Sequence, residues 1–264
     1  MKIVMLDQDG VVCDRQYQPT ADISELIYEL GQDGQIIIAP NTDTPVERIK
    51  RNYYQMIGLK PTVIVAERGA VVEINGRQDL VKNICGIREF IVEAEKVFRS
   101  MNCCVEIGDA SSWIHEGKKF RPNSYTLIVD GLREQTIAMY FMKIGYDGLA
   151  SVDPVFARHG LEVINSLVLP AGLDKPDYNE KYGIAICNAT GVSKTDGYML
   201  LRKQYSLAEF YMVGDSDSDI ILDESVIHCA VANASAGLKE KASFIADRPI
   251  TEGLAECLEW IRSQ

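Results

Sequence analysis

The sequence has few of the residues that bind nucleic acid or soft metals. It holds 27 Lys and Arg against 38 Asp and Glu, a formal net charge of −11, and only three histidines, His115, His159 and His228. A broad interface with a phosphate backbone needs clustered cations, and protein zinc sites use Cys or His ligands. We therefore expect neither a nucleic-acid partner nor a zinc site.

Long apolar runs and paired cysteines are also lacking. No apolar stretch is long enough to span a bilayer, and the N-terminus MKIVMLDQDG has no signal-peptide region. The seven cysteines are scattered and include no CxxC pair, which disfavours a disulfide framework. We expect a cytoplasmic protein with reduced cysteines and no membrane partner.

What the sequence does contain is an alternation of apolar strands and amphipathic helices near both ends. The periodicity predicts helices at 21–30, 45–57 and 194–204, and strands at 2–6, 35–39, 62–66, 210–213 and 230–232. This alternation is typical of an α/β fold with a doubly wound, mainly parallel sheet. Ligands in such sheets bind beyond the carboxyl ends of the strands.

The pattern changes in the middle of the chain. There it predicts helices at 87–101 and 133–144 and antiparallel strands at 103–107, 113–120 and 125–130. We therefore expect a core domain made of residues 1–79 and 189–264, with an inserted α+β domain at 80–188.

Acidic residues follow two of the predicted core strands. Asp7 and Asp9 come after the first strand, and GDSDSD occupies 214–219 after a later one. Carboxylates at about 4 Å repel by about 4 kcal/mol per pair at an effective dielectric near 20, so the cluster needs a cation. Oxygen ligands with room for water suit Mg²⁺.

Two rival interpretations of these motifs fail. Counted from Asp215, a calcium-binding loop would need Gly where Ile220 stands and Glu where Val226 stands. The GVSKT segment around Lys194 is similar to a phosphate-binding P-loop, but Ser193 replaces its required Gly. Neither an EF-hand nor a P-loop is therefore expected.

The motifs together resemble a known family. LDQDGVV at 6–12, a Thr after the second strand, Lys194 and GDSDSD resemble the four motifs of the haloacid dehalogenase superfamily of phosphatases. The stretch at 230–246 with Glu252-Gly253-Leu254 resembles the Cof-type, sucrose-phosphatase-like branch. The large insertion before Lys194 looks like the α+β cap of that branch, which implies a role in substrate specificity.

The resemblance implies roles for individual residues. Asp7 would attack phosphorus and form a phosphoaspartate, and Asp9 would act as general acid and then general base. Thr42 and Lys194 would hold the phosphate oxygens. The segment APNTDTP departs from the usual Thr-Gly-Arg, so Asn41 is an alternative to Thr42.

The same resemblance implies a magnesium site. Its residues would be Asp7, Asp9 through its main-chain carbonyl, Asp215, and Asp219, which would fix a bound water or Lys194. A further departure is Arg68-Gly69-Ala70, where many relatives have Asn-Gly-Ala. Arg68 either alters substrate preference or only pairs with Glu67 or Glu47.

The function expected from all this is Mg²⁺-dependent hydrolysis of a small phosphorylated metabolite. A sugar phosphate and a phosphorylated carboxylic acid both remain open. A phosphomutase of the same fold is the enzymatic alternative, and a non-catalytic binding protein is the alternative from another class.

Overall fold

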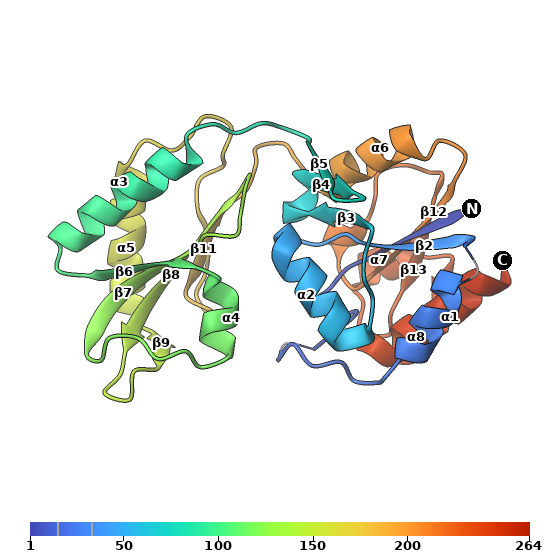
Figure 1. Cartoon of the computed structure of the whole chain (residues 1–264), viewed down its shortest axis with the longest axis horizontal. Helices are drawn as coiled ribbons and strands as arrows, with labels where there is room; N and C mark the ends of the chain where they lie inside the picture. The colour runs from blue at the N-terminus through green and yellow to red at the C-terminus, as the bar shows by residue number, and fades with distance from the viewer. Residues whose placement is uncertain (15, 33) are drawn as a thin grey trace. The chain divides into compact units, whose positions relative to one another are not determined.

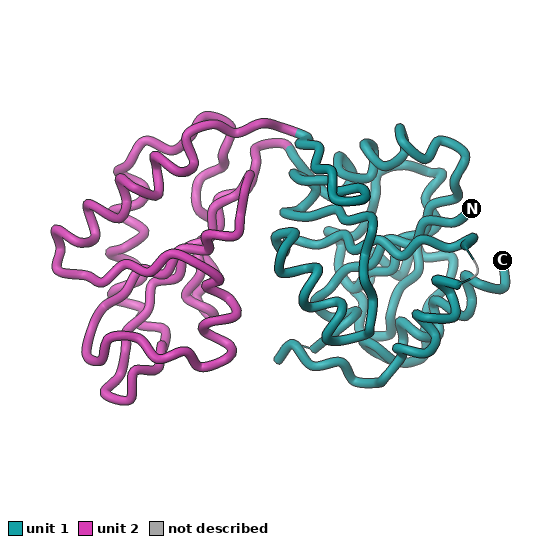
Figure 2. The backbone as a smooth tube through the Cα atoms, in the orientation of Figure 1, with its two compact units in different colours: residues 1–81, 192–264 teal, residues 82–191 magenta. Residues whose placement is uncertain are grey.

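A computed structural model of the chain describes residues 1–14, 16–32 and 34–264. The chain divides into two compact units, which Figure 2 colours separately. Unit 1 comprises Met1–Val81 and Val192–Gln264, and unit 2 comprises Lys82–Gly191.

Unit 1 is built on a parallel sheet of five strands. Their order is β14-β13-β12-β1-β2, and each neighbouring pair runs parallel. The strands are β1 (Lys2–Leu6), β2 (Ile36–Pro40), β12 (Glu209–Gly214), β13 (Val226–Ala230) and β14 (Phe244–Ile245). The predicted α/β class with a mainly parallel sheet is confirmed. The last predicted strand is misplaced, because 226–230 is paired rather than 230–232 and β14 follows it.

Helices cover both faces of this sheet. They are α1 (Ser24–Gln32), α2 (Val46–Ile57), α6 (Lys194–Gln204), α7 (Ala236–Lys241) and α8 (Ile250–Ser263). Figure 1 shows α6 on one side of β2, β12 and β13, with α1 and α8 on the other. Alternate residues of β1 enter two cores: Met5 lies in the cluster that contains Leu201 of α6, and Leu6 in the cluster that contains Leu258 of α8. Burial on both faces explains why the residues of β1 after Lys2 are all apolar.

A small antiparallel sheet adjoins the end of β2. It consists of β3 (Val63–Ala66), β4 (Val71–Ile74) and β5 (Arg77–Leu80), with a short 3-10 turn, η1 (Glu67–Gly69), between β3 and β4. The strand predicted at 62–66 therefore exists, but it pairs in this separate sheet. An isolated parallel bridge between Asn41 and Val65 links it to the main one.

Unit 2 has an α+β architecture. Its sheet has the order β10-β11-β8-β7-β6, with β9 paired to β8. The strands are β6 (Cys104–Gly108), β7 (Ser124–Asp130), β8 (Ile137–Ile144), β9 (Ala150–Val152), β10 (Asp177–Asn179) and β11 (Ile184–Cys187), and the helices are α3 (Ile87–Ser100), α4 (Ala110–His115) and α5 (Pro154–Ser166). Phe98, Phe141 and Phe156 form an aromatic cluster that joins α3, β8 and α5.

Three local predictions in unit 2 are wrong. The segment 133–144, predicted as a helix, contains β8, because a central strand buried on both faces is apolar at nearly every position and its period resembles that of a buried helix. The strand predicted at 113–120 falls on α4 and the loop after it; Asp109 caps this helix by accepting a hydrogen bond from the Ser112 N–H. The strand at 103–107 is present, but it pairs with β7 in parallel.

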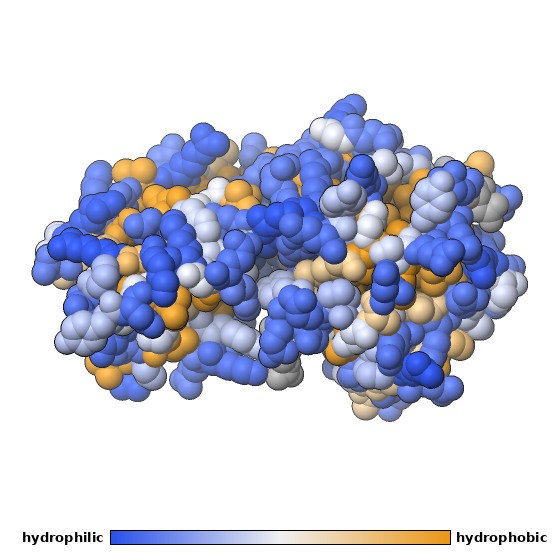
Figure 3. Space-filling view, turned by 60° about the horizontal axis from the view of Figure 1, so that its bottom comes forward, coloured by the Kyte–Doolittle hydropathy of each residue, from blue (hydrophilic) through white to orange (hydrophobic). Residues whose placement is uncertain are grey.

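The surface is mostly polar in the view of Figure 3, with hydrophobic side chains in small groups. Among the described residues, no helix is both long and apolar enough to cross a membrane.

His228 in β13 makes stability in unit 1 depend on pH. Its Nε2 accepts a hydrogen bond from the Ile221 N–H at 3.0 Å, and burial, followed by the charge of Lys241, lowers its pKa. The unfolded chain therefore binds a proton at pH values where folded His228 is still neutral. The stability that neutral His228 provides is present above about pH 6.5 and is lost as the pH falls further.

We predict that lowering the pH from 7.5 to 5.5 destabilises the wild type more than His228→Gln, which cannot titrate but keeps an acceptor for Ile221. Urea unfolding followed by the fluorescence of Trp260 in α8 measures the difference. Equal losses in the two proteins would contradict this account. His159→Gln, at an exposed site in unit 2, is the control and should behave as the wild type.

Candidate active site

Asp7 lies directly after β1, at the carboxyl edge of the parallel sheet. Its N–H donates to the Val213 carbonyl at 3.1 Å, which continues the ladder with β12, and its side chain is almost wholly buried. Gln8 is also buried, with Oε1 3.5 Å from Nδ2 of Asn52 on α2, whereas Asp9 is exposed. The turn after β1 thus fixes Asp7 inside the edge and leaves Asp9 at its surface.

A buried lysine joins Asp7 to the GDSDSD turn. Lys194 Nζ donates to Asp7 Oδ1 at 2.7 Å and to Asp219 Oδ1 at 2.6 Å. Lys194 is 4% exposed and Asp219 is 0% exposed. Residues from three distant parts of the sequence therefore meet here, as the predicted convergence of strand ends requires.

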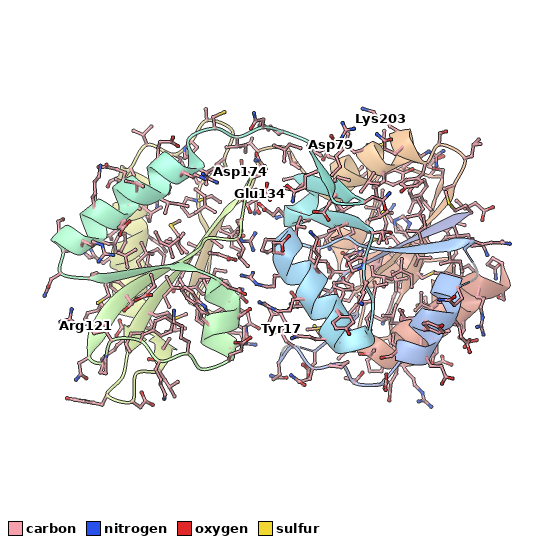
Figure 4. The ribbon with its side chains drawn as sticks, viewed as in Figure 1. Tyr17, Asp79, Arg121, Glu134, Asp174 and Lys203 are labelled. Atoms are coloured by element: carbon pink, nitrogen blue, oxygen red, sulfur yellow. The ribbon has the colours of Figure 1, made fainter. Side chains whose placement is uncertain are left out.

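Lys194 is positioned by the first turn of α6. The N–H and hydroxyl of Ser193 both donate to Asp196 Oδ2 at 2.8 Å, and this capping interaction fixes where the helix begins. Lys203, labelled in Figure 4, lies toward the other end of the same helix. The GVSKT segment thus leads into a capped helix start.

Asp219 is held by its own turn. Its Oδ2 accepts hydrogen bonds from the N–H groups of Asp215 at 3.0 Å and Ser216 at 2.9 Å, and from the Ser216 hydroxyl at 3.1 Å. A Cβ on Gly214 would overlap the Asp219 side chain, so this turn needs glycine at that position. Both oxygens of Asp219 therefore have partners within the protein.

The charges of this cluster perturb one another. Burial raises the pKa of Asp7 well above its usual range, with Lys194 opposing the shift and Asp219 adding to it. Burial and then the charge of Asp219 raise the pKa of Asp215 to about 6. Burial disfavours the Lys194 ammonium, but the carboxylates of Asp7 and Asp219 outweigh that effect and raise the pKa of Lys194. The site thus has more negative charge than one lysine compensates.

Three carboxylates of the site fit a metal ion. Asp7, Asp215 and Asp219 each offer one oxygen, and these oxygens all lie within 4.8 Å of one another. Such a set of hard oxygen donors matches the preference of Mg²⁺. Because both Asp219 oxygens already accept hydrogen bonds, Asp7 and Asp215 are the better direct ligands. Asp9 is outside this group, and its Oδ1 lies 3.5 Å from Gln8 Nε2.

Asn233 is a residue of this site to which the sequence analysis assigned no role. Its Nδ2 donates to the Gly10 carbonyl at 2.9 Å and lies 3.5 Å from Asp215 Oδ2, while its Oδ1 accepts from the Ile250 N–H at 2.9 Å. A Cβ on Gly10 would overlap the Asp215 carboxylate. Asn233 therefore connects the turn after β1, the turn after β12 and the start of α8. Asn233 belongs to the 230–246 stretch that carries the family resemblance, and this is the feature of the sequence that could have indicated its role.

The residues after β2 are buried beside this edge. Asn41 N–H donates to the Leu6 carbonyl at 2.7 Å, and within the described chain its buried Oδ1 has no hydrogen-bond partner. Thr42 Oγ1 lies 3.4 Å from Thr44 Oγ1. The Asn41 amide nitrogen and the Thr42 hydroxyl can each donate a hydrogen bond, so both residues remain candidates for a phosphate contact. Asp217, by contrast, is exposed and accepts a hydrogen bond from Ser235 Oγ, a structural role.

The η1 turn lies beside the same edge with an unusual backbone. Glu67 and Arg68 both have positive φ, 49° and 60°. A left-handed conformation costs an ordinary residue about 1–2 kcal/mol. The N–H groups of Glu67 and Arg68 donate to the carbonyls of Thr44 and Thr42, at 3.2 and 3.1 Å. The pairing of Arg68 with Glu67 or Glu47 that the sequence also allowed is not found among the described residues.

We predict that Lys194→Met lowers the free energy of unfolding by about 3–5 kcal/mol in the presence of EDTA, because it leaves buried Asp7 and Asp219 without their counter-charge. Urea titration measures this loss. Lys203→Met, at an exposed position of the same helix, should change stability by less than about 0.5 kcal/mol. Identical unfolding midpoints for Lys194→Met and the wild type would show that the buried ion pairs do not stabilise the core.

Comparisons with known proteins agree with this geometry. Residues 175–258, which include Lys194 and the GDSDSD turn, match the family of haloacid dehalogenase-like hydrolases. A phosphoglycolate phosphatase of Archaeoglobus fulgidus is 25% identical over 98% of this chain and 96% of its own length. A second phosphoglycolate phosphatase, from Methanosarcina acetivorans, is 26% identical over 45% of this chain and 57% of its own length.

Solved structures show the same fold. A haloacid dehalogenase-like hydrolase from Bacteroides thetaiotaomicron covers 98% of this chain and 99% of its own with a TM-score of 0.66 at 14% identity. A HAD/COF-like hydrolase from Plasmodium vivax covers 100% of this chain and 96% of its own with a TM-score of 0.63 at 15% identity. The chain is thus similar to haloacid dehalogenase-like hydrolases over residues 175–258, and it shares the fold of solved structures of such hydrolases.

Proposed function

We propose that the protein hydrolyses a small phosphate monoester with the help of Mg²⁺, through a phosphoaspartate on Asp7. The observation that carries the proposal is the buried Asp7 carboxylate, which is hydrogen-bonded to Lys194 and lies within metal-bridging distance of Asp215. A carboxylate held in this way at a sheet edge can present its second oxygen to phosphorus.

The expected mechanism assigns one task to each side chain. Asp7 attacks phosphorus and the ester bond breaks, Asp9 gives the leaving oxygen a proton, and Asp9 then takes a proton from the water that releases phosphate from Asp7. Lys194 and either Thr42 or Asn41 hold the phosphate oxygens. Asp219 keeps Lys194 in place through the hydrogen bond at 2.6 Å.

Bringing a carboxylate to a phosphate dianion requires compensating charge. At about 4 Å and an effective dielectric near 20 the repulsion is about 8 kcal/mol, which corresponds to a factor of about a million in rate. Bound Mg²⁺ would supply positive charge at Asp7 and Asp215, with Asp219 fixing a bound water or only Lys194. Lys194, which donates to Asp7 Oδ1, would supply the remaining charge.

The substrate we propose is a small phosphorylated carboxylic acid, with phosphoglycolate as the first candidate. Two curated relatives are phosphoglycolate phosphatases, and one of them aligns over nearly the whole chain. A sugar phosphate is the second candidate. We also propose that the inserted domain acts as a cap that selects the substrate.

We predict that Asp7→Asn abolishes phosphate release from p-nitrophenyl phosphate and phosphoglycolate in the presence of Mg²⁺, because the amide cannot act as the nucleophile. Asp217→Asn is the matched control: it changes an exposed aspartate in the same region and should retain activity. A colorimetric phosphate assay reads both. Full activity in Asp7→Asn would refute the phosphoaspartate mechanism.

We further predict that EDTA removes the activity and that added Mg²⁺ restores it. Calorimetric titration with Mg²⁺ alone should show weaker binding to Asp215→Asn than to the wild type, whereas Asp217→Asn should bind as the wild type does. Equal Mg²⁺ binding by Asp215→Asn and the wild type would remove Asp215 from the metal site.

A phosphomutase remains the enzymatic alternative, because transfer from phosphoaspartate to a sugar hydroxyl would use the same residues. Incubation with hexose phosphates separates the two activities. Release of inorganic phosphate supports the hydrolase, and an isomeric sugar phosphate formed without such release supports the mutase.

A further inference from the structure

We propose that Arg68 selects the substrate by binding a carboxylate that the substrate carries in addition to its phosphate. The inference rests on the proposed function, since it concerns the same site and names a group of the same substrate. It makes Arg68 a specificity-determining residue of an acid-selective phosphatase.

Backbone hydrogen bonds place Arg68 close to the reacting edge. The Arg68 N–H donates to the Thr42 carbonyl at 3.1 Å, and Thr42 follows the end of β2, which pairs with β1 beside Asp7. Neighbouring strands lie about 4.8 Å apart, so the backbone of Arg68 is about two such spacings, roughly 10 Å, from Asp7. An arginine side chain and a two-carbon acid attached to the phosphate together match that distance.

The turn that carries Arg68 is also fixed against α6. Gly69 packs so closely on the Ser193 carbonyl that a Cβ there would overlap it, and Lys194 is the next residue after Ser193. Figure 1 shows β3, β4 and β5 beside α6. Arg68 therefore starts from a rigid position between the Thr42 segment and the residue that contacts Asp7.

The backbone conformation of Arg68 is energetically unfavourable for an arginine. Arg68 has φ 60°, a conformation that glycine adopts freely and asparagine tolerates better than other residues. Strained backbone of this kind is concentrated at functional sites, where the side chain has a use. The turn itself gives no reason for a long cationic side chain at this position.

The Arg68 guanidinium has no competing partner within residues 1–14, 16–32 and 34–264. In the part of the chain that the structure describes, the half-buried Arg68 makes no side-chain hydrogen bond or ion pair. Nearby Lys194 already donates to Asp7 and Asp219. The acidic cluster of the site would repel a second negative group on the substrate, and Arg68 offers a planar pair of donors that fits a carboxylate.

The test compares two substrates that differ in this group. Phosphoglycolate carries a carboxylate, and 2-hydroxyethyl phosphate replaces it with an uncharged CH₂OH group. We expect Arg68→Gln to lower kcat/KM for phosphoglycolate by about 10- to 100-fold, mainly through KM, because a charge-assisted hydrogen bond is lost. Its kcat/KM for 2-hydroxyethyl phosphate should change less than about twofold.

Two further variants control for charge and geometry. Lys203→Gln removes one positive charge from an exposed position of α6 and should leave both substrates unaffected. Arg68→Lys keeps the charge without the planar pair of donors and should fall between Arg68→Gln and the wild type for phosphoglycolate alone.

Each contrary result has a defined meaning. Equal losses on both substrates, no loss on either, or a wild type that prefers 2-hydroxyethyl phosphate would each overturn the role of Arg68. A wild-type chain that releases phosphate from no monoester would overturn the proposed function itself, and this inference with it. A wild type that hydrolyses phosphoglycolate while Arg68→Gln retains the same preference would overturn the inference alone.

Stability gives an independent measurement. Arg68→Gly fits the left-handed backbone and should unfold at the same urea concentration as the wild type or a higher one, yet lose the preference for phosphoglycolate. Unfolding of Arg68→Gly at a clearly lower concentration would show that Arg68 is retained for stability and would overturn the proposal.

Discussion

The buried contact of Lys194 with Asp7 and Asp219 is the interaction on which the rest of the site depends. A lysine and two carboxylates with almost no solvent exposure are stable only if each compensates the others, since an isolated buried charge is costly. The contact also sets geometry. It ties the end of β1 to the turn after β12 and to the first residue of α6.

Several features of unit 1 follow from this constraint. α6 must begin at Lys194, and the capping interaction between Ser193 and Asp196 ensures that it does. Asp219 must face Lys194, and the N–H groups of Asp215 and Ser216 hold its other oxygen. Burial, with the charge of Asp219 adding to it, raises the pKa values of Asp7 and Asp215. One lysine does not neutralise the three neighbouring carboxylates, which could hold a cation. The excess of negative charge at this site would therefore also favour the binding of a cation for catalysis.

The edge of the site shows a different balance. Around Asp219 the polar groups are satisfied by short contacts with Lys194, Asp215 and Ser216. In η1, Glu67 and Arg68 have a left-handed backbone that is unfavourable for these residues. Gly69, which has no side chain, allows the turn to approach the start of α6 closely. Arg68 has no side-chain partner among the described residues, and a cation beside an acidic centre would suit the proposed substrate with two anionic groups, one for Lys194 and a bound metal and one for Arg68. In the proposed mechanism the nucleophile Asp7 and Lys194 are buried, whereas Asp9 and the proposed specificity residue Arg68 are more exposed.

The sequence by itself determined the parallel α/β core and the carboxylates and lysine that converge on its edge. Strands buried on both faces are short apolar runs in the sequence, and the acidic residues follow them directly. Both features are visible in the local sequence. It could not determine β8, whose apolar residues fit a helix as well as a central strand. Nor could it assign β3 to a separate sheet, because strand pairing is a long-range property.

Tertiary structure alone decided the roles within the site. Asp215, Asp217 and Asp219 carry the same side chain, but the fold gives them different partners. Asp219 contacts Lys194 and two N–H groups, and Asp217 accepts a hydrogen bond from Ser235. Asp215 remains a candidate metal ligand. Asn233 and Arg68 gain their importance in the same way, from segments that are distant in sequence and adjacent in space. Residue type sets which interactions are possible, and the neighbours that folding supplies decide which of them are made.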